Sequence, residues 1–212
     1  MARFVDIHPD NPQPRLVQQI VDALGDPQQP ALIAYPTDSG YALGCKLGNR
    51  EGRDRILRIR DLDERHHFTL MCDTFAQLGQ FVQVDNNAFR AIKAVTPGPY
   101  TFILPATAEV PRRLMHPKKR TVGVRIPDHT FVHALLAALG EPLLTSTLIL
   151  PGEEEARTMG WEVKEELDHV VDLVIDTGDD TPPQPTTVID WSGDTPVVAR
   201  HGAGDPSRFE DA

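Results

Sequence analysis

Short apolar runs, each ended by proline, glycine or a polar turn, alternate with amphipathic stretches along this chain. Ala31-Leu32-Ile33-Ala34-Tyr35 is stopped by Pro36, a pattern typical of a buried strand. The residues before Gly25 instead repeat apolar side chains at helical spacing. We expect strands near residues 31–35, 41–45, 68–72, 100–105, 121–126, 143–150, 171–176, 186–190 and 196–200. We expect helices near residues 10–25, 51–60, 73–81, 85–95, 130–139 and 153–169.

The order of these elements restricts the fold class. Strands and helices are interleaved without a clean repeat, which favours an α/β (α+β) fold over a regular doubly wound one. The prediction is a single domain over residues 4–204, with a twisted, mixed and partly antiparallel sheet flanked by helices. At 212 residues the chain can form one sizeable core without a second domain. Residues 205–212 are predicted to be a polar, frayed tail.

The compartment is predicted from what the sequence lacks. No apolar run reaches the roughly 18–20 residues that cross a bilayer, so no membrane association is expected. The first residues lack the apolar core of a secretory signal. Two cysteines, Cys45 and Cys72, suit a reducing environment better than a disulfide framework. We therefore expect a cytoplasmic protein.

Charge is distributed unevenly along the chain. The formal net charge is −10, which argues against nucleic acid as a partner. Residues 46–125, however, hold 15 of the 21 Lys and Arg residues but only 8 of the 31 Asp and Glu residues, a local charge of +7. A basic segment within an acidic chain is consistent with a focused site for phosphates or carboxylates, and equally with solvated helix faces.

Three motifs carry candidate binding residues. Tyr35-Pro36-Thr37-Asp38-Ser39-Gly40-Tyr41 follows a strand and offers the hydroxyls of Thr37 and Ser39, although any turn has this composition. Arg58 and Arg60 lie on different faces of a helix, but at its fraying end both can reach one bulky anion; offsetting the helix dipole is the alternative role. Arg125 lies within an apolar strand, where an arginine is costly to bury unless a carboxylate or ligand pairs with it.

Two further segments complete the candidate site. Thr145, Ser146 and Thr147 place three hydroxyls in a row within an apolar strand, where they suit either β structure or a polar pocket. Thr96-Pro97-Gly98-Pro99 is a rigid turn that feeds the next strand.

Several chemistries are not supported by the sequence. It contains no phosphate-binding glycine loop, GxGxxG, GxSxG or HExxH motif. His129 and His133 are four residues apart without a carboxylate in the zincin pattern, so no metal site is predicted. His66 and His67 are interpreted as surface or ligand-adjacent residues. Arginines and hydroxyls remain, which suit binding and positioning better than covalent chemistry.

In their order along the chain, these segments resemble the YrdC-like family of threonylcarbamoyl-adenylate synthases. The family's tyrosine-proline-threonine-aspartate element resembles residues 35–41, its Lys-x-Arg element residues 58–60 and its Pro-Gly-Pro-x-Thr turn residues 97–101. Its Arg-x-Pro-x-His element resembles residues 125–129, and its Pro-Ser-Thr-Val strand resembles residues 185–190. The arginine of its closing strand resembles Arg200. Residues 8–12, 68–72 and 148–152 resemble the YciO subgroup in particular, and the resemblance spans residues 4–204.

The resemblance implies a YrdC-like fold and a reaction of ATP, threonine and bicarbonate that forms a carbamoyl-adenylate for tRNA adenosine modification. Mg²⁺ would accompany ATP, and no tightly bound cofactor is expected. Thr37, Ser39, Arg125, Thr145 and Ser146 would then bind the substrate. The implied nucleotide-binding residues are Arg58, Arg60, Thr147, Thr187 and Arg200, of which Arg58 and Arg60 are the catalytic candidates.

The chain departs from the family pattern at three places, one of which is Cys72, at the end of a strand where many members carry a histidine. The family's Ser-x-Asn element falls near Thr145-Ser146-Thr147-Leu148, where no asparagine is present, so an amide able to orient a nucleotide is lost. Arg58 replaces the family's lysine and changes the donor geometry. Three functions therefore stay open: the synthase, a non-enzymatic protein that binds double-stranded RNA or tRNA, and a scaffold without chemistry.

Overall fold

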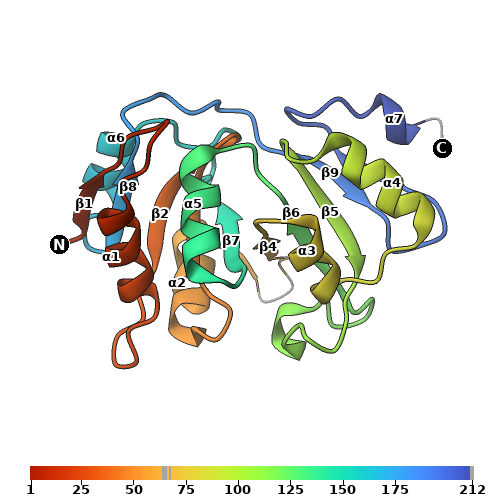
Figure 1. Cartoon of the computed structure of the whole chain (residues 1–212), viewed down its shortest axis with the longest axis horizontal. Helices are drawn as coiled ribbons and strands as arrows, with labels where there is room; N and C mark the ends of the chain where they lie inside the picture. The colour runs from red at the N-terminus through yellow and green to blue at the C-terminus, as the bar shows by residue number, and fades with distance from the viewer. Residues whose placement is uncertain (64–65, 67, 211–212) are drawn as a thin grey trace.

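One mixed sheet runs through the molecule (Figure 1). The structure is a computed structural model that describes residues 1–63, 66 and 68–210. Its strands are β1 (Arg3–Asp6), β2 (Ile33–Thr37), β3 (Gly40–Lys46), β4 (Thr69–Met71), β5 (Tyr100–Pro105), β6 (Thr121–Arg125), β7 (Leu143–Thr147), β8 (Leu173–Asp176), β9 (Thr187–Asp190) and β10 (Val197–Arg200). Within the described residues their order across the sheet is β1-β8-β2-β3-β7-β4-β6-β5-β9-β10.

Parallel and antiparallel pairing are combined in this sheet. The central strands β2, β3, β7 and β4 pair antiparallel in sequence, and β6 pairs antiparallel with β5. Parallel pairs join β1 to β8, β8 to β2, β4 to β6 and β5 to β9. The predicted α/β class with a mixed, partly antiparallel sheet is therefore confirmed.

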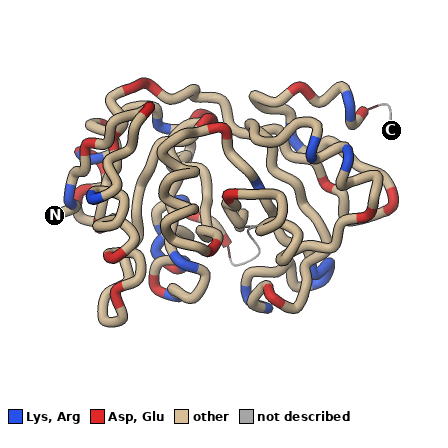
Figure 2. The backbone as a smooth tube through the Cα atoms, viewed as in Figure 1, with Lys and Arg blue, Asp and Glu red and all other residues tan. Residues whose placement is uncertain are grey.

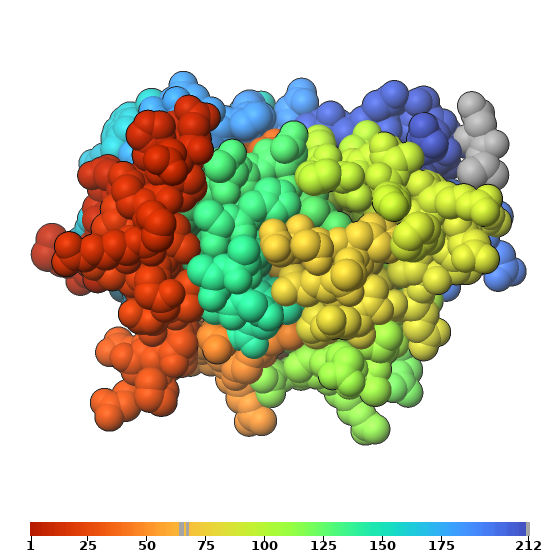
Figure 3. Space-filling model, viewed as in Figure 1, coloured from red at the N-terminus to blue at the C-terminus, as the bar shows by residue number. Residues whose placement is uncertain are grey.

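Helices flank the sheet. They are α1 (Pro14–Leu24), α2 (Arg50–Arg60), α3 (Phe75–Phe81), α4 (Asn86–Val95), the 3-10 turn η1 (Arg112–Leu114), α5 (Thr130–Leu139), α6 (Gly160–Leu167) and α7 (Ser207–Glu210). In the space-filling view α1, α5, α3 and α4 lie across the face toward the viewer (Figure 3). None of the helices in the described part of the chain is long and apolar enough to cross a membrane.

Successive residues of β2 point to opposite sides of the sheet and pack in two different buried clusters. On β2, Ile33 and Tyr35 pack in one buried cluster with Ile20 of α1 and Phe131 of α5. Leu32 and Ala34 belong to the second cluster, which includes Ile56 of α2, Val163 of α6, and residues of α3 and α4.

Most expected elements form within a few residues of the predicted bounds, but the helix predicted over 153–169 begins only at Gly160. The preceding segment is held in a loop, because Arg157 bonds both oxygens of Glu153 and both oxygens of Glu166. The strand predicted to reach Leu150 ends at Thr147.

Both ends of the chain are more ordered than expected. Strand β1 was not predicted, because four residues give little pattern and its partner β8 lies about 170 positions away. The prediction of a frayed tail is wrong for residues 207–210: α7 buries Phe209 to 2% exposure against the rings of Tyr100, Phe102 and Trp191. Residues 211–212 of that tail lie outside the described residues, as does His67.

Candidate functional site

A cavity of about 210 Å³ opens over the half of the sheet that runs from β7 to β10. We call it the arginine cavity, after Arg60 and Arg200, which line it together with His66. Six hydroxyl residues also line it: Thr69, Thr101, Thr145, Ser146, Thr147 and Thr186. The side chains of Ile103, Ile149 and Val188 give it an apolar wall.

The alternation of residues along β4, β5 and β6 creates this cavity. Leu70, Phe102 and Val124 are in the core, so their neighbours face the other side of the sheet. Those neighbours are Thr69, Thr101 and Gly123, and all three line the cavity. A Cβ on Gly123 would lie 2.9 Å from Thr69 Oγ1, so glycine keeps this wall open.

Arg60 enters the cavity because it is the last residue of α2. Asn49 caps the start of this helix by accepting a hydrogen bond from the N–H of Gly52 at 2.8 Å. Asp61 ends it in a left-handed conformation, with φ of 50°. From that position Arg60 Nη1 donates to Ser146 Oγ at 2.7 Å and Nε donates to the carbonyl of Ile149 at 3.1 Å.

Arg200 reaches the same cavity from β10. Its Nη2 donates to the carbonyl of Thr186 at 2.8 Å and contacts Thr186 Oγ1 at 3.1 Å. The hydroxyls of Thr186 and Thr101 are 2.8 Å apart and form a hydrogen bond. Arg200 is therefore positioned by Thr186, the residue that precedes β9.

The electrostatics of the arginine cavity favour an anion. Burial, and next the positive charge of Arg200, lower the pKa of Arg60 to about 10. Burial, and next the charge of Arg125, lower the pKa of Arg200. Among the described residues no carboxylate forms an ion pair with Arg60 or Arg200, and none lines the cavity. A bound phosphate or carboxylate offsets the repulsion between two cations that have no acidic partner.

A second cavity, of about 220 Å³, has the opposite composition. We call it the aspartate cavity, because five carboxylates line it: Asp10, Asp38, Asp128, Asp179 and Asp180. Thr37 and His129 are also part of its lining. Burial is the main cause of a lowered pKa at His129, which favours the neutral imidazole.

Arg125 lines neither cavity but pairs with a carboxylate of the aspartate cavity. At 3% exposure it forms an ion pair with Asp38, whose second oxygen accepts the N–H of Asp128 at 3.0 Å. Burial lowers the pKa of Arg125, against the opposing effect of Asp38. Arg125 Nε has no hydrogen-bond partner among the described residues, so a further acceptor could be bound there.

Tyr35 joins this region to the arginine cavity. Thr145 Oγ1 donates to the carbonyl of Leu43 at 2.9 Å, so the hydroxyl of Tyr35 donates to Thr145 across their 2.9 Å separation. Burial raises the pKa of Tyr35 to about 12.

The structure brings five of the predicted site residues together in the arginine cavity: Arg60, Thr145, Ser146, Thr147 and Arg200. Thr187 is fully buried; its hydroxyl donates to the carbonyl of Gly204 at 2.6 Å and accepts the N–H of Gly202 at 3.0 Å. Its neighbour Thr186 lines the cavity instead.

The turn residues Thr37 and Ser39 lie apart from that group. Thr37 donates to the carbonyl of Gly40 at 2.7 Å and accepts the N–H of Ser39 at 3.1 Å, so its hydroxyl closes the turn between β2 and β3. The hydroxyl of Ser39 is buried and has no partner among the described residues.

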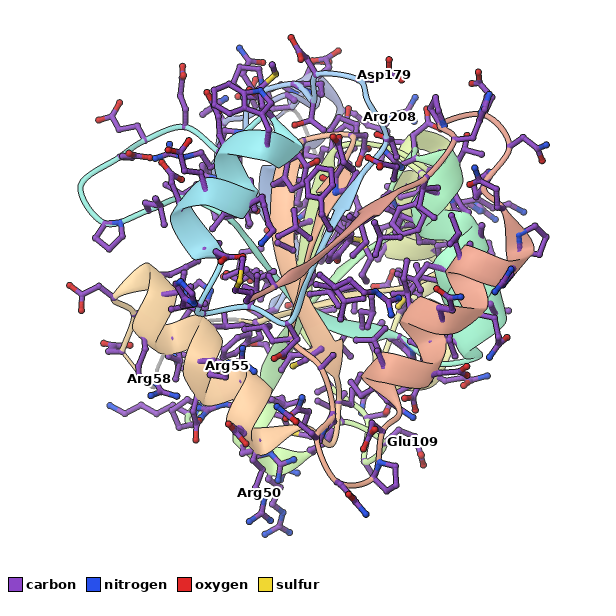
Figure 4. All side chains as sticks on the ribbon, turned by 90° about the vertical axis from the view of Figure 1, so that its left-hand side faces the viewer. Arg50, Arg55, Arg58, Glu109, Asp179 and Arg208 are labelled. Carbon is purple, nitrogen blue, oxygen red and sulfur yellow. The ribbon has the colours of Figure 1, made fainter. Side chains whose placement is uncertain are left out.

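Arg58 is separated from Arg60 by the geometry of the helix. It is exposed on α2, where Figure 4 also labels the exposed Arg50 and the half-buried Arg55. It lines a different, open cavity that also includes Arg55 and Asp172. Its Nε donates a hydrogen bond to the carbonyl of Asp54 at 3.4 Å. The structure therefore does not bring the two arginines to one ligand.

Several cavity residues were not predicted from the sequence. Thr69 and Thr101 alternate with apolar residues, which is the signal that identifies them in retrospect. Asp38 was part of a predicted motif, but no sequence pattern joins it to Arg125, 87 residues away.

The donor set of the arginine cavity does not fit a magnesium ion held by the protein. Mg²⁺ prefers carboxylate and water ligands, and no carboxylate lines the cavity among the described residues. The described part of the chain also contains no group of three or more His, Cys, Asp or Glu side chains arranged to hold a metal ion.

Comparison with known proteins shows close relatives over the whole chain. The family described as "Telomere recombination" (Sua5, YciO and YrdC) matches residues 28–202. The uncharacterized protein YciO of Escherichia coli strain K12 is 50% identical over 209 residues, covering 99% of this chain and 100% of the relative. The crystal structure of E. coli YciO has a TM-score of 0.94, with the same coverage of both chains.

More distant relatives carry functional names. A threonylcarbamoyl-AMP synthase of Vibrio vulnificus is 30% identical over 162 residues, covering 75% of this chain and 84% of the relative. The crystal structure of P. abyssi Sua5 complexed with L-threonine has a TM-score of 0.85 at 24% identity, and covers 98% of this chain and 60% of the other. At 24% identity, the similarity to P. abyssi Sua5 shows a shared fold alone.

Proposed function

The chain belongs to the Sua5/YciO/YrdC family, and we propose that it forms a carbamoyl-adenylate from ATP, bicarbonate and an amino acid, with threonine as the amino acid. The observation that carries the proposal is the pair Arg60 and Arg200, which face a cavity of hydroxyls without carboxylate partners among the described residues. Such a cavity suits a phosphate group.

The reaction needs no bond to the protein. The neutral amine of threonine combines with bicarbonate to give a carbamate and water. A carbamate oxygen then attacks the α-phosphorus of ATP, and the bond to pyrophosphate breaks. Charge accumulates on phosphate oxygens, so positioning and cationic stabilisation can supply most of the catalysis.

We assign different roles to the arginines and to the hydroxyl residues. Arg60 and Arg200 would stabilise the phosphates, and the hydroxyls of Ser146, Thr147 and Thr186 would position the nucleotide. Arg125, whose Nε lacks a partner, would bind the threonine carboxylate beside Asp38. Thr37 and Ser39 hold the turn that places Asp38. The adenylate would then supply a tRNA adenosine modification.

The two cysteines bear on the cellular compartment. Cys45 and Cys72 are free and buried, and burial raises the pKa of each thiol to about 12, so neither is a reactive thiolate. Free thiols agree with a reducing environment, and we propose the cytoplasm, where ATP is available.

The test is pyrophosphate release. Purified protein with ATP, threonine, bicarbonate and Mg²⁺ is expected to release pyrophosphate, and omission of threonine should abolish it. Arg60→Ala should lower the rate at least tenfold, since charge-assisted hydrogen bonds contribute roughly 1.5–3 kcal/mol. Arg90→Ala, an exposed arginine on α4, is the matched control. Nucleotide binding without pyrophosphate release would instead indicate a scaffold without chemistry.

A second candidate function, RNA binding, is favoured by a separate surface. Arg50 and Arg53 of α2 and Arg112 and Arg113 of η1 surround an open cavity of about 420 Å³, with Asp54 as its acidic residue. Basic residues gather at this end of the molecule in Figure 2.

Phosphate contacts release counterions, so a double-stranded RNA should bind with an affinity that falls steeply with salt. Arg112→Glu with Arg113→Glu should remove that binding, while Arg90→Glu should not; salt-independent binding would argue against this function.

A further inference from the structure

Arg200 belongs to a strand that has little packing of its own. β10 is the last strand in the order of the sheet, and three of its four residues are exposed, including Arg200. Its pairing with β9 is irregular between Val198 and Arg200. A strand with one half-buried side chain gains little from apolar burial. The position of the guanidinium must therefore be set by other contacts.

The residue that precedes β9 holds the guanidinium. Arg200 donates to the carbonyl of Thr186 from Nε at 3.1 Å and from Nη2 at 2.8 Å, and Nη2 also donates to Thr186 Oγ1 at 3.1 Å. Within the described residues Nη1 makes no hydrogen bond, so its two N–H groups can be offered to an anion. These bonds keep their geometry only while the backbone near residue 200 stays fixed relative to residue 186.

Thr187, the next residue along the chain, fixes the segment that follows Arg200. Its side chain is fully buried. Its Oγ1 accepts the N–H of Gly202 at 3.0 Å and donates to the carbonyl of Gly204 at 2.6 Å. One hydroxyl thus uses its proton and a lone pair on two backbone groups of the same segment. A valine of the same shape would make neither bond.

Gly202 lets this segment lie directly against the start of β9. A Cβ at this position would lie 2.3 Å from the carbonyl oxygen of Pro185 and 2.5 Å from that of Thr186. The N–H of Ala203 donates to the carbonyl of Pro185 at 2.9 Å. Residues 200–204 and 185–187 are therefore joined backbone to backbone, so a shift of the first segment also moves the guanidinium of Arg200.

We propose that Thr187 is a positioning residue for Arg200, and that its hydroxyl keeps the guanidinium aimed at an anion in the arginine cavity. Thr187 is not among the described residues that line this cavity, so it acts through Arg200 and not on the ligand. This role differs from the nucleotide contact that the family resemblance implies for Thr187. The proposal rests on the anion-binding part of the proposed function and not on the adenylation reaction.

The experiment is calorimetric titration with sulfate, at an ionic strength held constant with sodium chloride. Thr187→Val keeps the volume and the branched shape but loses both hydrogen bonds, and it should lower the sulfate affinity about three- to tenfold. Thr187→Ser restores the hydroxyl and should bind sulfate within about twofold of wild type. The matched control is Thr121→Val, at a buried threonine of β6 whose hydroxyl has no partner among the described residues; its affinity should be unchanged.

A double-mutant cycle separates positioning from a purely structural role. Arg200→Ala should lower the sulfate affinity about tenfold, because it removes a charged donor. In that background Thr187→Val should change the affinity less than about twofold, since the residue through which it acts is absent. Equal losses in both backgrounds would overturn the proposal, and so would a Thr187→Val protein that binds sulfate like wild type.

A second measurement needs no variant at Thr187 and stands even where Thr187→Val does not fold. Coupling between two sites is reciprocal, so an anion that requires a fixed Arg200 must in turn stabilise the Thr187 bonds. Saturating sulfate should therefore slow hydrogen exchange of the Gly202 amide at least about threefold in the wild-type protein, and not in Arg200→Ala. Equal slowing in both proteins, or none in wild type, would contradict the proposed role.

The outcomes also separate this proposal from the synthase reaction. Non-additive losses in the cycle support the role of Thr187 even for a protein that releases no pyrophosphate. Additive losses overturn that role even for an active synthase. A wild-type protein that does not bind sulfate, or that binds it equally well after Arg200→Ala, overturns both the positioning role and the anion site on which it depends.

Discussion

Arg60 and Arg200 in the arginine cavity bond to hydroxyl and carbonyl oxygens, whereas Asp38 in the aspartate cavity is paired with the buried guanidinium of Arg125. The first cavity therefore holds positive charge without an acidic partner among the described residues, and the second neutralises one of its own charges. The difference indicates that the first cavity keeps its charge for a ligand, whereas in the second an ion pair within the protein stabilises the fold beside the proposed threonine site. Substitutions in the two regions should consequently affect different measurements.

The largest effect is expected from Arg125→Ala. It would leave the Asp38 carboxylate, whose side chain is 12% exposed, without its cation, and breaking a buried ion pair from one side costs about 3–5 kcal/mol. Urea denaturation should show this loss in the free energy of unfolding. The double variant Arg125→Ala with Asp38→Ala should recover part of it. A loss below about 1 kcal/mol in the single variant would show that Asp38 is not held by this pair.

The link between the cavities can be tested at high pH. The pKa of Tyr35 is raised by burial to about 12, so the unfolded chain loses this proton first, and the stability it contributes falls between about pH 10 and pH 12. In Tyr35→Phe, the loss of unfolding free energy between pH 10 and pH 12 should be smaller by a few kcal/mol, as measured by urea denaturation at each pH. The buried thiols of Cys45 and Cys72, also raised to about 12, remain in both proteins and serve as the common background. An unchanged slope would contradict the assignment.

Arg60→Ala tests the opposite behaviour of the arginine cavity. Removing one of two like charges should leave the free energy of unfolding unchanged or raise it by up to about 1 kcal/mol, while the affinity for ATP falls about 10–100-fold. Denaturation and calorimetry on the same preparation give both values. A large loss of stability would show that Arg60 is a structural cation like Arg125.

The sequence predicted Arg125 for a physical reason that the structure supports. An arginine inside an apolar strand requires a partner, and Asp38 is that partner. The identity of that partner could not be predicted from the sequence, because the two residues are 87 positions apart. They meet only when β2, β3, β7, β4 and β6 are assembled. Long-range pairing of this kind is set by the sheet order.

The hydroxyl residues show the same limit. Thr186 and Thr187 are adjacent and chemically identical, yet one lines the cavity and the other bonds the backbone of residues 202–204. The choice depends on which face of β9 is turned to the cavity, and a four-residue strand carries too little alternation to predict that. The closing helix α7 was also missed, because four residues with one buried apolar side chain, Phe209, give too little pattern to predict it.

The smallest effect is expected from Arg58→Ala, and it decides how the Arg-x-Arg element works. Successive residues of a helix are about 100° apart, so positions 58 and 60 diverge by about 200° unless the helix end unwinds. Here α2 continues through Arg60, and Arg58 stays exposed on its outer side. Arg58→Ala should change ATP affinity less than about twofold and the free energy of unfolding by less than about 0.5 kcal/mol. Calorimetry that shows a loss equal to that of Arg60→Ala would mean that the helix end opens on binding and brings both arginines to one ligand. A result near wild type would restrict the catalytic cation of this element to Arg60.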